Sequence, residues 1–269
     1  MPNRLRFSSL LTAASLLSGC IQPTINPITT PPASETTAGA VTDSAEWVAL
    51  APGLERRTLQ PGGNYTLTQF LVVRIDPAYF TFRAHYRPGE PLTISGWRDA
   101  LAGAAVIVNA NFFDAQGQAL GLLVSDGQVF GTAYTDRGGF FTVQDGQVRV
   151  RSTLLEPYRG EALEQAVQAF PMLVSGGAAA YTTPRPDRAS RRTAIGQDQA
   201  GRVLIVVSSS LIGMRLTEFS TFLAASDLAL VEAFNLDGGG STMLHIDSGE
   251  ALQVPSFDAV PAVLAVYPR

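Results

Sequence analysis

The feature of this chain that most restricts its folding is a run of three glycines directly after an apolar segment. Residues 233–244 read Ala-Phe-Asn-Leu-Asp-Gly-Gly-Gly-Ser-Thr-Met-Leu. Consecutive glycines inside a strand or helix cost conformational entropy, so a folded chain keeps them where the backbone turns sharply or approaches a ligand closely. The segment therefore predicts either an anion cradle with Asp237 at its rim, or a tight turn in which Asp237 caps the next segment.

Short runs rich in β-branched and aromatic residues dominate the chain beyond residue 46. The expected strands are 65–75, 79–86, 105–111, 121–125, 139–143, 147–151, 203–208, 229–235 and 262–266. Asp126-Gly127 and Asp145-Gly146 lie between apolar runs and predict hairpin turns. The last three runs are continuously apolar, as expected of buried central strands.

Helical patterns are fewer, and they cover residues 95–102, 160–169 and 217–226. Together with the strands they predict an α+β fold. We expect a single domain with a mixed central β-sheet, antiparallel hairpins and a few flanking helices.

The first twenty residues have the three regions of a secretory signal peptide. Arg4 and Arg6 form a basic start, an apolar stretch follows, and Leu17-Ser18-Gly19-Cys20 ends it. Cys20 is the only cysteine of the chain, and its position resembles a bacterial lipoprotein box, in which the thiol is acylated and becomes the mature N-terminus. We expect export, lipidation at Cys20 and attachment to the cell envelope, with the outer membrane or cell surface favoured over the inner membrane.

Composition sets the remaining boundaries. Residues 21–44 are rich in proline, threonine and serine and poor in large apolar side chains, so we interpret 20–45 as a lipidated tether and 46–269 as the globular domain. The formal net charge is −4 and becomes more negative once residues 1–19 are removed, which argues against a nucleic-acid partner.

Two further segments carry side chains suited to ligand binding. On a strand, Asn109 and Asn111 face the same side, so their amides are expected to point together at one edge of the sheet and bind hydroxyl groups, unless both satisfy neighbouring backbone. Arg192 offers a planar fork of donors that matches a phosphate, and Thr193 adds a hydroxyl.

The order of these motifs resembles the phosphodiester glycosidase family from about Ala105 to the C-terminus. The motifs are Asn109-Ala-Asn-Phe-Phe113, Pro171-Met-Leu-Val-Ser-Gly-Gly177, Arg192-Thr-Ala-Ile-Gly196 and Asn235-Leu-Asp-Gly-Gly-Gly-Ser-Thr242. The resemblance implies hydrolysis of a sugar-1-phosphodiester at the glycosidic bond, in envelope or exopolysaccharide glycans.

Such a reaction needs a phosphate clamp and a carboxylate near the sugar. We expect Arg192, Thr193 and the amides of Gly238, Gly239 and Gly240 to bind phosphate, with Ser241 and Thr242 beside them, and Asp237 to stabilise positive charge at the sugar. Asp114 and Glu232 are the candidates for a second acid.

Two other functions fit parts of the pattern. Ser241 could act as the nucleophile of a serine hydrolase, although the Gly-x-Ser-x-Gly elbow is missing. A non-catalytic lipoprotein could bind envelope glycans with the same amides and aromatic rings.

Metal ligands are sparse. The chain has two histidines, too few for an ordinary zinc site, and calcium is conceivable only from the carboxylates of Asp114, Asp237 and Asp247, which lack regular calcium-loop spacing. We assign no metal and no cofactor.

Overall fold

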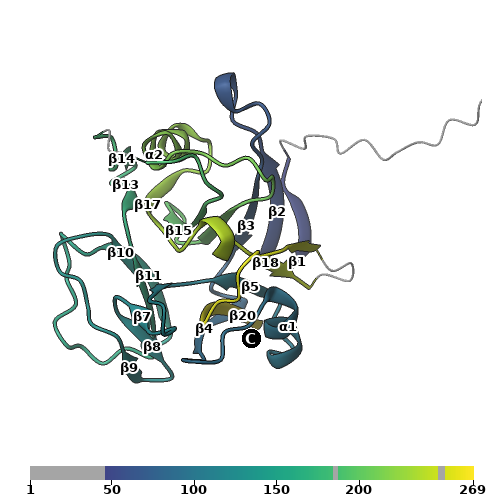
Figure 1. Ribbon diagram of the computed structural model, residues 1–269. Coiled ribbons are helices and arrows are strands. Elements are labelled where there is room, and N and C mark those ends of the chain that lie inside the picture. Colours follow the sequence, from purple (N-terminus) through teal and green to yellow (C-terminus); the bar gives the residue numbers. More distant parts are fainter. Residues whose placement is uncertain (1–45, 184–186, 248–251) are drawn as a thin grey trace, which may run out of the picture. The chain divides into compact units, whose positions relative to one another are not determined.

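The computed structural model describes residues 46–183, 187–247 and 252–269 (Figure 1). The predictions made for residues 1–45, including the signal peptide, the tether and the lipidation of Cys20, lie outside these ranges. The described chain consists mostly of β-strands, and every strand pairing in it is antiparallel.

The largest sheet has eight strands in the order β1-β2-β3-β16-β15-β17-β13-β14. Their bounds are β1 Val48–Ala51, β2 Leu54–Leu59, β3 Phe70–Ile75, β13 Met172–Ser175, β14 Ala178–Ala179, β15 Thr193–Asp198, β16 Val203–Ser208 and β17 Leu230–Asn235. Its central strands β3 and β16 come from distant parts of the chain and pair from Phe70 opposite Ser208 to Ile75 opposite Val203.

Two five-stranded sheets complete the architecture, in the orders β19-β18-β5-β20-β4 and β11-β10-β12-β8-β9. Their strands are β4 Phe80–Tyr86, β5 Val106–Asn109, β8 Leu123–Ser125, β9 Gln128–Phe130, β10 Gly139–Gln144, β11 Gln147–Ser152, β12 Gln165–Ala169, β18 Leu244–Ile246, β19 Leu252–Val254 and β20 Ala262–Pro268. A separate two-stranded ladder joins β6 Phe112–Phe113 to β7 Ala119–Leu120.

Side chains along a strand point alternately to the two faces of its sheet, and one face of each of the three larger sheets contributes to a shared core. On β3, Leu71 and Val73 pack into a central apolar cluster to which β4, β5, β10, β12, β16 and β20 also contribute. The intervening Phe70 and Val72 point to the opposite face of the sheet. The continuously apolar runs at 203–208 and 262–266 form β16 and β20, and their side chains are buried on both faces as predicted. In the third such run, which forms β17, Val231 and Glu232 stay partly exposed.

The outer faces are covered by two α-helices among the described residues. α1 (Ile94–Ala100) packs Trp97 against the outer face of the sheet that contains β5 and β20. α2 (Leu216–Ala225) covers the eight-stranded sheet, where the ring of Phe219 stacks on that of Phe70 with centroids 4.9 Å apart. No helix in the described ranges combines the length and the apolarity needed to cross a membrane.

Three short-range predictions are confirmed. Asp126 and Gly127 both have positive φ in the turn between β8 and β9, and Asp145 and Gly146 do the same between β10 and β11. The helix expected at 217–226 is α2, which begins and ends one residue earlier, at Leu216 and Ala225.

Two expectations are wrong. The sheets are antiparallel throughout the described residues, so there is no mixed central sheet, and the fold is dominated by strands. The helix expected at 160–169 is instead strand β12, which lies between β10 and β8. Its polar Gln165 and Gln168, which resemble the solvated positions of an amphipathic helix, are buried and bind backbone amides of Ala84 and Leu122.

Candidate active site

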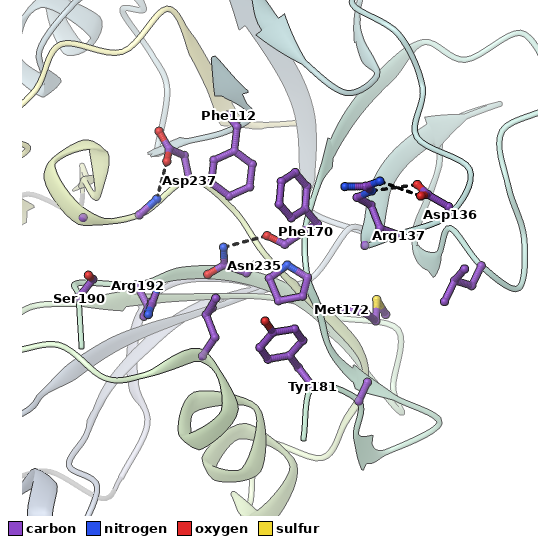
Figure 2. A pocket seen from close by; sticks show the side chains of 17 residues that line it. Phe112, Asp136, Arg137, Phe170, Met172, Tyr181, Ser190, Arg192, Asn235 and Asp237 are labelled. Atoms are coloured by element: carbon purple, nitrogen blue, oxygen red, sulfur yellow. Dashed lines mark hydrogen bonds and ion pairs between the residues drawn. The ribbon is translucent and has the colours of Figure 1, made fainter. Parts of the chain in front are cut away.

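A cavity of about 850 Å³ opens where the ends of several strands meet (Figure 2). This volume lies within the range of about 300–1,000 Å³ that is common for small-molecule sites. It is lined by Phe112, Asp136, Arg137, Gly138, Leu154, Phe170, Pro171, Met172, Ala180, Tyr181, Ser190, Arg192, Leu216, Asn235, Asp237, Gly238 and Gly239. The end of β17 and the glycine turn form one side, and the segment before β10 forms another.

Asp237 lies directly after β17 and is held by its backbone. Its amide donates to the carbonyl of Ala110 (3.1 Å), and its carbonyl accepts from Nδ2 of Asn109 (2.6 Å). Burial raises the pKa of the Asp237 carboxyl to about 6, against the opposing effects of hydrogen bonds from Ser241 and from the Gly238 amide. The charge of Asp258 adds to the rise. The result is a carboxyl that titrates near neutral pH at the wall of a cavity.

Two of the three glycines pack closely against neighbouring residues, and the third has a backbone conformation that favours glycine. A Cβ on Gly238 would lie 2.9 Å from the carbonyl oxygen of Arg191, and one on Gly240 would lie 2.0 Å from a carboxylate oxygen of Asp258. Gly239 has φ +62°, in the region that L side chains rarely adopt. The turn is thus shaped by its neighbours in the fold.

The expected anion cradle is not formed by the first two glycine amides. Gly238 N donates to the carboxylate of Asp237 (2.8 Å), and Gly239 N donates to the carbonyl of Arg191 (2.9 Å). Both amides are therefore already bound to protein acceptors, and Gly240 does not line the cavity. Ser241 and Thr242 are buried, and they also lie outside the cavity lining.

The amides of Asn109 and Asn111 serve the fold, as the backbone alternative predicted. Asn109 Oδ1 accepts from Thr193 Oγ1 and from Met243 N, both at 3.0 Å. Asn111 Nδ2 donates to the carbonyls of Leu122 (3.0 Å) and Gln168 (2.9 Å). The expectation that both point at one ligand is wrong, because β5 ends at Asn109 and the period of two does not continue to Asn111.

Thr193 is fully buried and outside the cavity lining, since its hydroxyl is bound to Asn109. It positions Asn109, and through that residue the backbone of Asp237. We find no direct route from Thr193 to a ligand in the cavity.

Arg192 does line the cavity, but much of its guanidinium is engaged by the protein. Its Nε donates to the carbonyl of Met214 (2.7 Å), and one terminal nitrogen donates to Asp187 (3.0 Å) and to the carbonyl of Arg188 (2.8 Å). Arg192 and Asp187 are both largely shielded from water. Through these hydrogen bonds, Arg192 connects residues 187–188 to Met214, which lies just before α2.

The two carboxylates expected to supply the second acid lie elsewhere. Asp114 Oδ1 accepts from the amides of Gln116 (2.9 Å) and Gln118 (2.8 Å) and closes a turn. Glu232 Oε1 accepts from Ser175 Oγ and from Gly176 N. Neither residue lines the cavity that contains Asp237, so neither is placed for proton transfer there.

The cavity is also lined by residues that the sequence analysis did not predict as site residues. The rings of Phe112 and Phe170 lie with centroids 4.8 Å apart, and Arg137 and Asp136 form an ion pair beyond them (Figure 2). Asn235 is buried with its Nδ2 bound to the carbonyls of Phe170 and Leu236. Phe112 and Asn235 belong to motifs noted above, but Arg137 stands in an unremarkable turn, and no local pattern marks it.

Metal ligands do not assemble in the described part of the chain. No group of three or more histidine, cysteine, aspartate or glutamate side chains is close enough there to hold an ion. His245 is buried, which lowers its pKa, and its Nδ1 lies 3.3 Å from Nε2 of Gln253.

Comparison with known proteins adds an independent observation. A model of the phosphodiester glycosidase family matches residues 102–267. The catalytic domain of zebrafish N-acetylglucosamine-1-phosphodiester alpha-N-acetylglucosaminidase, solved in a form auto-inhibited by its pro-peptide, has a TM-score of 0.65 and 20% identity, over 81% of this chain and 85% of that chain. A hypothetical protein from Synechocystis has a TM-score of 0.62 and 16% identity, over 83% of this chain and 64% of that chain. No curated protein matches the sequence.

Proposed function

The chain belongs to the phosphodiester glycosidase family, and from this premise we propose that it hydrolyses the glycosidic bond of a sugar-1-phosphodiester. The observation that carries the proposal is the buried carboxyl of Asp237, whose pKa is raised to about 6 at the wall of the cavity. A general base works best when its pKa lies near the working pH. The family supplies the class of bond, and Asp237 supplies a group suited to its cleavage.

The proposed step involves one water molecule. The water oxygen forms a bond to the anomeric carbon, while the bond from that carbon to the phosphate oxygen breaks and its electron pair leaves with the phosphomonoester. Ionised Asp237 accepts the proton of the water and stabilises the positive charge that develops on the sugar. A phosphate leaving group is weakly basic, so it needs little help from a second acid.

Other side chains keep Asp237 in place for this role. Asn109 holds the carbonyl of Asp237, and Thr193 in turn holds Asn109. Arg192 fixes the neighbouring loop through Asp187 and remains the candidate that offers its other terminal nitrogen to the phosphate. The predicted lipid anchor at Cys20 supports an envelope or exopolysaccharide glycan as the physiological substrate.

The test is hydrolysis of a panel of α- and β-linked sugar-1-phosphodiesters by the mature chain carrying Cys20→Ser. We expect free sugar and phosphomonoester as products, and a loss of kcat/KM on the order of a thousandfold in Asp237→Asn. Asp99→Asn is the matched control, because Asp99 is an exposed residue of α1 paired with Arg98 outside the cavity. Undiminished turnover by a folded Asp237→Asn protein would contradict the mechanism. Glycan binding without turnover in the wild type would favour the lectin-like alternative.

A further inference from the structure

Arg137 extends the cavity beyond the reaction centre. In Figure 2 the rings of Phe112 and Phe170 lie between Asp237 and the Arg137 guanidinium. Those rings have centroids 4.8 Å apart, and Cζ of Arg137 lies 5.9 Å from the centroid of the Phe170 ring. Both residues line the cavity, and the two rings lie between the guanidinium and Asp237.

The backbone of Arg137 is fixed at this place by the fold. The next residue, Gly138, has φ +74°, and a Cβ there would lie 2.0 Å from the carbonyl oxygen of Ala169. The Gly138 carbonyl accepts from the amide of Thr153 (3.0 Å). The residue between Arg137 and β10 is therefore held against the end of β12, which fixes the backbone directly after Arg137.

The side chain is also oriented before any ligand arrives. Its Cζ lies 5.4 Å from the ring of Tyr134 as well as close to Phe170. Tyr134 is itself anchored, because its amide and its carbonyl both bind the side-chain amide of Gln168, each at 2.8 Å. Contact with aromatic rings restricts the rotation of the arginine side chain and so reduces the entropy lost when its planar guanidinium binds an anion.

Asp136 competes for the same guanidinium. It accepts from Nε of Arg137 (2.9 Å) and from one terminal nitrogen (2.7 Å). The two side chains are 64% and 53% exposed, and exposed ion pairs of this kind contribute little net stability. An anionic ligand group can therefore replace Asp136, and the negative charge of Asp136 weakens the binding of that group.

We propose that Arg137 forms an anion subsite that selects substrates with a second negative charge on the leaving-group side of the scissile bond, and that Asp136 limits its affinity. This inference rests on the proposed function and names its substrate class. The preferred diester carries a further phosphate or carboxylate on its phosphomonoester portion, as in an anionic polymer, and a diester without that second charge is the poorer substrate. Both anions are recognised by the same planar fork of donors.

The experiment compares three sugar-1-phosphodiesters that share one linker and end in a hydroxyl, a carboxylate or a phosphate. For the wild type we expect kcat/KM to be about tenfold higher for the anionic substrates than for the neutral one. Arg137→Gln removes this preference, because it lowers kcat/KM for the anionic diesters far more than for the neutral one. Asp136→Asn increases the preference, and added salt reduces it. The ratio of the carboxylate to the phosphate substrate tells which anion the subsite favours.

Arg149→Gln is the matched control, because Arg149 is similarly exposed and paired with Glu156 but lies outside this cavity. It is expected to keep the wild-type preference, and Arg137→Lys to keep part of it. Equal ratios in the wild type and Arg137→Gln, or a reduced preference in Asp136→Asn, would overturn the proposal. If no diester is hydrolysed, calorimetric binding of the same three compounds still tests the subsite, so its failure is separable from failure of the enzymatic proposal.

Discussion

Burial of the Asp237 carboxyl makes both stability and activity depend on pH. Its folded-state pKa of about 6 lies above the ordinary value of 3.8, so the folded state binds this proton more tightly than the unfolded state. Ionisation therefore destabilises the fold, and this cost is absent below pH 3.8, grows as the pH rises, and is complete above about pH 6.

Asp237→Asn removes that cost. We expect the variant to have a free energy of unfolding about 2–3 kcal/mol above the wild type at pH 7.5, and nearly the same as the wild type near pH 4. Urea unfolding at both pH values measures the difference. A difference that does not change with pH would show that the carboxyl is not desolvated in the folded protein.

The activity profile follows from the same titration. Because the ionised carboxylate is the active form, kcat/KM of the wild type is expected to rise with pH through about 6 and then level off. The measurement is the pH dependence of initial rates for a good diester substrate. A profile that falls across this range would assign the proton-donating form to Asp237 instead.

A substitution at Asn111 tests whether its side-chain amide supports the fold or binds a ligand. Its Nδ2 donates to the carbonyls of Leu122 and Gln168 inside the protein, so Asn111→Leu removes both hydrogen bonds and should cost about 2 kcal/mol of unfolding free energy. The folded fraction is expected to keep kcat/KM within a few fold of the wild type. A normal stability with a large loss of activity would return Asn111 to the site.

At the level of elements, the start of β10 decides where the cavity wall lies. Gly138→Ala places a Cβ at positive φ and against the carbonyl oxygen of Ala169, so we expect a loss of more than about 2 kcal/mol, since the strained φ and the clash add. Gly146→Ala is the control, because Gly146 also has positive φ but nothing lies within 4 Å of a Cβ there. Equal losses in urea unfolding would contradict the role given to the contact with Ala169.

Local sequence patterns were sufficient to predict the hairpin turns but not the strand β12. Asp-Gly turns need positive φ wherever they occur, and both hairpins formed where expected. The sequence of β12, Gln165-Ala-Val-Gln-Ala, permits either structure, and it became a strand because β8 and β10 offer two open edges. Its glutamines find partners only through those neighbours, which no local pattern reveals.

For the whole molecule, attachment to the envelope remains a prediction from the first twenty residues. Cys20 is the only cysteine, so Cys20→Ser is expected to release the exported protein from the membrane fraction without changing the activity of the domain. Fractionation of cells that express each form tests this. Membrane attachment that persists in Cys20→Ser would exclude acylation at this thiol as the anchor.

The sequence by itself determined the buried strands, the hairpins, the glycine turn and the family. These features follow from local preferences: apolar runs are buried on both faces, Asp-Gly supplies positive φ, and the motifs occur in order along the chain. It also pointed to Asp237, a carboxylate beside three glycines, which the fold places at the wall of the cavity.

Only the tertiary structure decided what the polar side chains do. Asn109, Asn111 and Thr193 became internal supports, and Arg192 became a link between loops, because buried donors and acceptors pair with whatever backbone the fold brings near them. Asp114 and Glu232 were separated from Asp237, and Arg137 was brought to the cavity. A hydrogen-bond partner or a cavity wall depends on contacts between distant segments, and these contacts exist only once the sheets have packed.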